Sequence, residues 1–201
     1  QSVLFPVANS IVQAAVNTMG TDTIAAWGIC DKLDMLIWLL ADAMGPALTT
    51  YTAQNMGAGR WDRVCEGNRI GAAMSGAAVA AVSLGLYFLT APLGGLFVPA
   101  TDAPAVVPLA ASFMRRMAPF FFFYALAESF SGACCGTGDT VRPMILTLLS
   151  ICLLRVLGIL LLLPRQHTME CIIDIYIASW IAAGIGFLVL WQWEKKRVQR
   201  M

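Results

Sequence analysis

The chain has 201 residues, of which 59% are hydrophobic and only 12% are charged, and its formal net charge is +1. A soluble domain carries about 25% charged residues, with which it covers its surface. This chain has too little polar material for that, and its mean hydropathy is +0.73. The composition excludes an ordinary soluble domain and predicts an integral membrane protein.

A membrane-spanning helix needs about 20 mostly apolar residues. We predict an all-α chain of six transmembrane helices, approximately over residues 3–19, 23–53, 70–98, 106–135, 144–163 and 171–193. The second span is too long for a simple crossing, so we expect a kink at Gly45-Pro46 and a polar first part that lines a cavity. We expect a loop over residues 54–69.

The cysteines fall mostly within apolar runs, with no CxxC motif and with His167 as the single histidine. We therefore expect free cysteines that pack as small hydrophobes, with no disulfide framework, metal site or cofactor. The first residues show no signal-peptide pattern. Since the chain opens inside an apolar run without Met, we expect it to be a fragment.

Basic residues predict the orientation of the helices, because they gather on the cytoplasmic side of a membrane protein. If the first helix runs outward, the outer connections hold only Arg165. The cytoplasmic side then holds Arg60, Arg63, Arg69, Arg142, Lys195, Lys196, Arg197 and Arg200. We predict a multi-pass protein of the plasma membrane whose C-terminus is cytoplasmic.

Glu128 interrupts the aromatic-rich fourth span. A charge at membrane depth is costly, which makes it a functional-site hypothesis. Glu128 lies about 12 Å before the helix end expected at Gly136, on the same side as Tyr124 and Ser131. We expect it to exchange a proton or bind a cation. The alternative is a structural ion pair with Arg155 of the next helix.

The second span carries three further acids. Asp31 and Asp34 share a helix face, and Asp42 lies close to the same side, where a row of carboxylates would suit a cationic cargo. Asp42 is the more specific candidate because it sits nearer the middle of the apolar run. In the alternative interpretation, Lys32 neutralises Asp31 and Asp34 near a membrane interface.

Two glycine-rich segments follow the second and fourth spans. Neither has the preceding strand or the GK[ST] ending of a phosphate-binding loop. We instead expect Arg60 and Arg142 to neutralise helix C-termini or lipid phosphates. The glycines are expected to stop helices and turn the chain tightly, and they are Gly57, Gly59, Gly136 and Gly138.

These segments resemble the multidrug and toxic compound extrusion (MATE) family. GPALTTYTAQNMGAGRWDRV is similar to the end of a lobe's second helix and the following loop, with a Q-N-x-G-A-G-R pattern. SGACCGTGDTVRP is similar to the family's S-G-x-x-R-G-x-G-D-T-x-x-P. The motif residues are Gln54, Asn55, Gly57, Gly59, Arg60, Gly136, Gly138 and Asp139. The resemblance covers essentially the whole chain and matches helices seven to twelve of a twelve-helix transporter.

The resemblance implies an antiporter that exports organic, often cationic compounds in exchange for Na⁺ or H⁺. It would work by alternating access between this six-helix lobe and an N-terminal lobe that the chain lacks. Some relatives use acids on helices seven and ten. Here the expected helix seven has only uncharged polar residues, including Asn9 and Gln13, and Tyr124 stands near the position of the helix-ten acid. Coupling could therefore lie in this lobe or in the absent one.

Three alternatives stay open. A lipid-linked oligosaccharide flippase of the same superfamily would need a more cationic cavity, and a membrane scaffold would not need the intramembrane acids. An enzyme would need a nucleophile with a placed base, or a metal cluster, and His167 in an outer loop offers neither. We expect no catalytic residues and no nucleic-acid partner.

Overall fold

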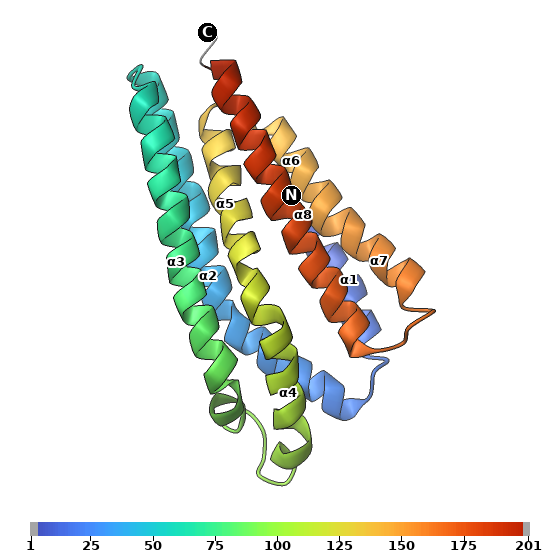
Figure 1. Cartoon of the computed structure of the whole chain (residues 1–201). Helices are drawn as coiled ribbons and strands as arrows, with labels where there is room; N and C mark the ends of the chain where they lie inside the picture. The colour runs from blue at the N-terminus through green and yellow to red at the C-terminus, as the bar shows by residue number, and fades with distance from the viewer. Residues whose placement is uncertain (1–3, 199–201) are drawn as a thin grey trace.

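A computed structural model describes residues 4–198, and the secondary structure in that range is helical throughout (Figure 1). Residue 3, where the first span was expected to begin, and Arg200 lie outside the described residues. The elements are α1 (Leu4–Val16), α2 (Thr21–Gly57), α3 (Trp61–Gly94), α4 (Ala103–Met117), η1 (Ala118–Phe120), α5 (Phe121–Gly136), α6 (Val141–Thr147), η2 (Leu148–Leu153), α7 (Leu154–Leu162) and α8 (Met169–Val198).

These elements form six rods within the described range. One rod comprises α4, η1 and α5, and another comprises α6, the π-helical turn η2 and α7. Four rods are long and apolar enough to cross a membrane: α3, α4 to α5, α6 to α7, and α8. Of the other two, α1 has 13 residues, and α2 has 37 but carries four charged residues between Asp31 and Asp42. The charged part of α2 faces a cavity, as described below.

Helices α2 and α3 meet in a turn much shorter than the loop expected over residues 54–69. Helix α2 continues to Gly57 and α3 begins at Trp61. The turn is tight because Gly59 has φ +69°, and the Arg60 N–H closes it by donating to the Asn55 carbonyl at 2.8 Å. The polar residues that suggested a loop lie on the last turn of α2 and the first turns of α3.

Helix α2 runs without interruption through Pro46, which removes one helical hydrogen bond. Figure 1 shows that the helix changes direction along its length. The kink expected at Gly45-Pro46 therefore does not interrupt the helix.

Helices α2 and α5 pack closely through glycine. A Cβ atom at Gly132 would lie 2.8 Å from the carbonyl carbon of Gly45, and one at Gly136 would lie 2.7 Å from the Thr49 carbonyl oxygen. The Thr49 hydroxyl lies 2.9 Å from the Gly45 carbonyl oxygen and 3.0 Å from that of Gly132. Small residues allow such approach between helices in lipid, and this approach fixes which α2 side chains face α5.

Aromatic side chains fill the core beside this contact. Trp180 of α8 is fully buried, with its ring centroid 5.0 Å from that of Phe121 and 5.8 Å from that of Tyr176. Trp38 of α2 lies edge-on to Trp180 with centroids 6.3 Å apart. The core thus joins α2, α5 and α8 around one wall of the polar cavity.

The two ends of the bundle differ in charge. The α2–α3 turn, the α5–α6 turn and the end of α8 lie together at one end (Figure 1). Arg60, Arg142 and Lys195 belong to these segments, whereas the α7–α8 connection with Arg165 lies at the opposite end. Which end faces the cytoplasm stays a prediction from this asymmetry.

Replacing Gly132 with Ala should destabilise the protein by about 1–3 kcal/mol, since the added methyl must push the α2 backbone away. Gly28→Ala is the matched control, because a Cβ at Gly28 meets nothing within 4 Å and alanine favours a helix. Thermal unfolding in detergent measures both. Equal unfolding temperatures for the two variants would contradict the close α2–α5 contact.

Candidate functional site

A polar cavity of about 1020 Å³ opens among α1, α2, α5, the η2–α7 segment and α8. The seven residues that the sequence suggested for ion coupling or cargo contact all line it. They are Asn9, Gln13, Asp31, Asp34, Asp42, Tyr124 and Glu128. Arg155 and Tyr176 join them from α7 and α8. The cavity is therefore built from segments far apart in the sequence.

Asp42 and Tyr124 join α2 to α5 inside the cavity. The Tyr124 hydroxyl donates a 2.6 Å hydrogen bond to Asp42 Oδ1. Tyr124 is only 6% exposed, and the Trp38 ring lies edge-on against it with a centroid distance of 4.4 Å. In the MATE resemblance, Tyr124 stands near the position where some relatives have an acid on helix ten. Here its hydroxyl binds a carboxylate from the neighbouring helix α2 instead.

Glu128 lies one turn further along α5, half-buried, where the helix meets Gly45. A Cβ atom at Gly45 would be 3.6 Å from both the Glu128 carbonyl oxygen and Glu128 Oε2. Among the described residues, no Arg, Lys or His lies within ion-pair distance of Glu128. Two carboxylates, Asp42 and Glu128, therefore face one cavity without an ion-pair partner among the described residues, an arrangement that favours binding of a proton or a cation.

Arg155 has other partners than the one expected. Its Nε donates to Ser179 Oγ at 2.9 Å, and its guanidinium lies 4.0 Å from the centre of the Tyr176 ring. The structural ion pair with Glu128 is therefore wrong for this structure. Sequence reasoning missed the cation–π contact, because Tyr176 and Ser179 come from a helix with no charge pattern that points to Arg155.

Asp34 and Arg155 are the most deeply buried charged groups of the cavity, at 6% and 3% exposure. Within the described part of the chain, neither Asp34 Oδ1 nor Arg155 Nη2 has a hydrogen-bond partner. Burying an unsatisfied polar atom is costly. Among the described residues, Asp34 and Arg155 therefore each hold one buried, unsatisfied polar atom beside the cavity.

Asp31, Lys32 and Asp34 do not form the locally neutralised group considered as an alternative. No ion pair links them in the structure as described. The Lys32 ammonium instead lies 5.2 Å from the centre of the Phe97 ring. Asp34 is buried while Asp31 is exposed, so the two carboxylates occupy different depths of one cavity.

Helix α1 contributes uncharged polar groups to the opposite wall. Gln13 donates an amide hydrogen bond to Asn17 Oδ1 at 3.0 Å, and the Ser10 hydroxyl donates to the Pro6 carbonyl at 2.8 Å. Asn9 and Gln13 are exposed to the cavity side of the helix. This wall can accept or donate hydrogen bonds but adds no charge.

The glycine motifs lie outside the cavity, at the end of the bundle that holds the α8 C-terminus. Helix α2 ends at Gly57 and α5 ends at Gly136. Gly59 and Gly138 have φ values of +69° and +94°, in the left-handed region that glycine adopts at least cost. Gln54 and Asn55 belong to the same turn, since the Gln54 carbonyl accepts from the Ala58 N–H at 3.1 Å and the Asn55 carbonyl from Arg60.

The two motif arginines pair with carboxylates instead of helix ends. Arg60 Nε lies 3.6 Å from Asp62 Oδ1, and Arg142 Nη1 lies 2.7 Å from Asp139 Oδ2. The expectation that Arg60 and Arg142 neutralise helix C-termini is therefore corrected, whereas their contact with lipid phosphates stays a prediction. An acid close in sequence was available to each of them.

Asp139 belongs to a four-residue charge cluster that ties the α5–α6 turn to α8. Glu194 is fully buried, with Oε1 lying 3.2 Å from Arg142 Nη1 and 3.1 Å from Arg197 Nη1. Burial of Asp139 opposes its ionisation, but hydrogen bonds from the backbone and side chain of Arg142 outweigh it and hold the pKa of Asp139 below its usual value. Sequence reasoning missed Glu194, because it lies in a polar C-terminal segment in which no residue stands out.

Asp139→Asn should lower the unfolding free energy by about 1 kcal/mol, because the paired arginine is half exposed and screened by solvent. Since the pKa of Asp139 is lowered on folding, this contribution is present above about pH 4 and is lost as the pH falls below it. The unfolding free energies of the parent and of Asp139→Asn, compared from pH 3 to pH 7, measure this contribution. Asp62→Asn is the control, because Asp62 belongs to an exposed ion pair. An equal loss of unfolding free energy in the control would contradict a stabilising role of the charge cluster.

Fold and cavity together define a class: a multi-pass helical membrane protein with acids, a buried guanidinium and hydrogen-bonding groups around one polar cavity. The sequence model of the MatE family matches residues 1–161. The chain belongs to the MatE family.

Two relatives carry names that describe drug resistance. The chain is 27% identical over 132 residues to the "Probable multidrug resistance protein NorM" of Thermotoga maritima, an alignment that covers 66% of this chain. It is 30% identical over 141 residues to the "Multidrug resistance protein PmpM" of Pseudomonas aeruginosa, which covers 69% of it. In each case the chain matches 28% of the relative's length.

Proposed function

We propose that this chain forms one six-helix lobe of a secondary antiporter that exports organic cations, including drugs, in exchange for H⁺ or Na⁺. The observation that carries the proposal is the pair of carboxylates, Asp42 and Glu128, in one cavity of a MatE-family membrane protein. The names of the two relatives support multidrug transport as the activity.

Asp42 and Glu128 are the coupling groups in this proposal. Within the described residues both carboxylates lack a salt-bridge partner, so a proton or Na⁺ is the species that relieves their mutual repulsion. Tyr124 holds Asp42 toward α5 through its 2.6 Å hydrogen bond. An arriving organic cation would displace the ion from the same carboxylates, and this competition couples export to ion entry.

Charge also selects the cargo in this proposal. The lining includes four carboxylates against two cationic side chains, namely Asp31, Asp34, Asp42 and Glu128 against Lys32 and Arg155. A net negative cavity attracts organic cations. It does not suit the phosphate of a lipid-linked oligosaccharide, which supports drug export over the flippase alternative.

The complete transporter in this proposal includes a second six-helix lobe, N-terminal to this one, packed against the open side of the cavity. The cavity supports this because its charged α2 residues Asp31 and Asp42 are exposed in the chain alone. The lobe would lie in the plasma membrane with the α8 C-terminus in the cytoplasm, in keeping with the basic residues at that end.

Export should fall when either coupling carboxylate is neutralised. In cells that express the full-length protein, Glu128→Gln and Asp42→Asn should each reduce the initial efflux rate of a fluorescent organic cation by about tenfold, since a charged contact in such a site contributes about 1.5–3 kcal/mol. Assays with and without Na⁺, and at two external pH values, identify the ion.

Glu170→Gln is the matched control for this experiment. Glu170 is an exposed acid in the first turn of α8, outside the cavity, and its replacement should leave efflux unchanged at equal expression. Normal efflux by both cavity variants would mean that these acids are structural and that the proposal is wrong.

A further inference from the structure

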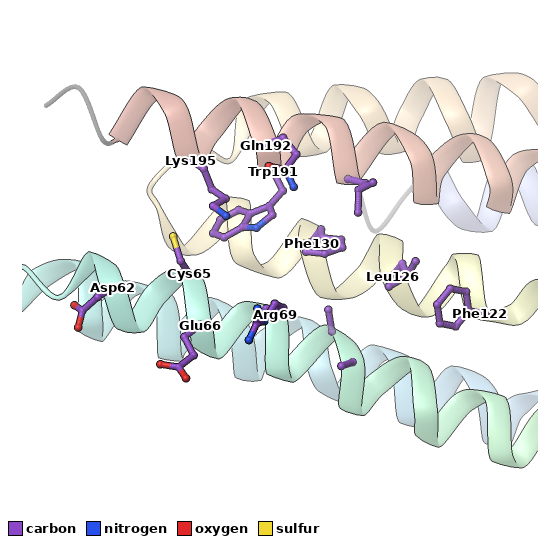
Figure 2. Close-up of a pocket in the computed structure, with 13 residues that line it drawn as sticks. Asp62, Cys65, Glu66, Arg69, Phe122, Leu126, Phe130, Trp191, Gln192 and Lys195 are labelled. Carbon is purple, nitrogen blue, oxygen red and sulfur yellow. The ribbon is translucent and has the colours of Figure 1, made fainter.

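A second cavity, of about 650 Å³, opens between α3, α5 and α8, on a different side of α5 from the polar cavity. Figure 2 shows Trp191 and Lys195 of α8 reaching toward α3, with Phe130, Leu126 and Phe122 arranged along α5. We call it the lateral groove. It lies at the end of the bundle that holds the α8 C-terminus, where a membrane protein meets the headgroups of one leaflet.

The lateral groove changes from charged to apolar along its length. Its rim carries Asp62, Glu66 and Arg69 from the first turns of α3, and Lys195 from the last turns of α8. Its deeper walls are apolar and include Ala73, Leu126 and Phe122. A binding partner must therefore be amphiphilic, with a charged head at the rim and a hydrocarbon part below it.

The apolar part of the groove continues past Phe122. A smaller, largely apolar hollow of about 310 Å³ shares Phe122 with the lateral groove and follows α3 as far as Phe88. The Phe122 ring lines both hollows and lies on Gly76, where a Cβ atom would come 2.7 Å from it. From Arg69 to Phe88 helix α3 rises about 28 Å, which exceeds the roughly 15 Å depth of one leaflet's hydrocarbon. The two hollows together are therefore long enough for one acyl chain.

Three charged groups of the rim have no partner among the described side chains. Arg69, Lys195 and Glu66 make no side-chain ion pair or hydrogen bond there, whereas Asp62 is paired with Arg60 at 3.6 Å. The rim therefore offers two cations and one carboxylate. Two cations suit a phosphodiester, and the carboxylate suits an ammonium group beside it.

We propose that the lateral groove binds one phospholipid with a zwitterionic amino headgroup, of the phosphatidylethanolamine type. Its phosphate lies between Arg69 and Lys195, its ammonium group donates hydrogen bonds to Glu66, and one acyl chain follows α5 past Phe122. An anionic lipid without an ammonium group leaves Glu66 unpaired beside its phosphate, so it binds less well.

Native mass spectrometry of the purified full-length protein tests this binding. The protein is offered phosphatidylethanolamine and phosphatidylglycerol of identical acyl chains in equal amounts, and we expect preferential retention of phosphatidylethanolamine. Arg69→Gln and Lys195→Gln should each reduce its retention by about threefold, the range for a half-exposed charge pair. Arg63→Gln and Lys196→Gln are matched controls, since both side chains are exposed and lie outside the groove.

Two further variants distinguish recognition of the headgroup from binding of the acyl chain. Glu66→Gln should abolish the preference for the amino headgroup while some lipid is still retained. Ala73→Phe should block the apolar track and remove most retained lipid. Ala78→Phe should not, since Ala78 is exposed on α3 and lies outside the linings of both hollows. Equal retention of the two lipids by the parent protein, or the same loss in the controls as in the groove variants, would overturn the proposal.

Discussion

The close approach of α2 and α5 at Gly45 and Gly132 is the contact on which the rest of the site depends. It brings Asp42 within hydrogen-bond distance of Tyr124 and seats Glu128 one turn away in the same cavity. Carboxylates at membrane depth are costly and persist where a cavity or a binding partner compensates them. The glycines thus permit an arrangement that larger residues would forbid, and that arrangement carries the proposed ion exchange.

Features set by local chemistry could be predicted from the sequence. The apolar runs indicated an all-helical membrane protein. The helical period also predicted that Asp31, Asp34 and Asp42 face one cavity, and all three line it. Gly59 and Gly138 were expected in tight turns, where both have positive φ. Each of these inferences needs only a few neighbouring residues, because helix period and turn conformation are properties of short segments.

Features that depend on packing between distant segments could not be predicted. Arg155 was expected beside Glu128 but lies on Tyr176, because the rotation of α7 against α8 decides which ring it meets. Glu194 carried no signal of burial, since its partners Arg142 and Arg197 become neighbours only when the α5–α6 turn meets α8. The start of α3 at Trp61 was also hidden, since the polar residues of its exposed first turns resemble a loop.

The central claim is that a cation and an organic substrate compete for Asp42 and Glu128. The most direct measurement is the number of protons released, and its sensitivity to Na⁺, when an organic cation binds to the purified full-length transporter in weakly buffered detergent solution. We expect proton release, or Na⁺-sensitive binding, by the parent protein and its loss in Glu128→Gln. Binding without proton release and without any effect of Na⁺, unchanged in that variant, would contradict it.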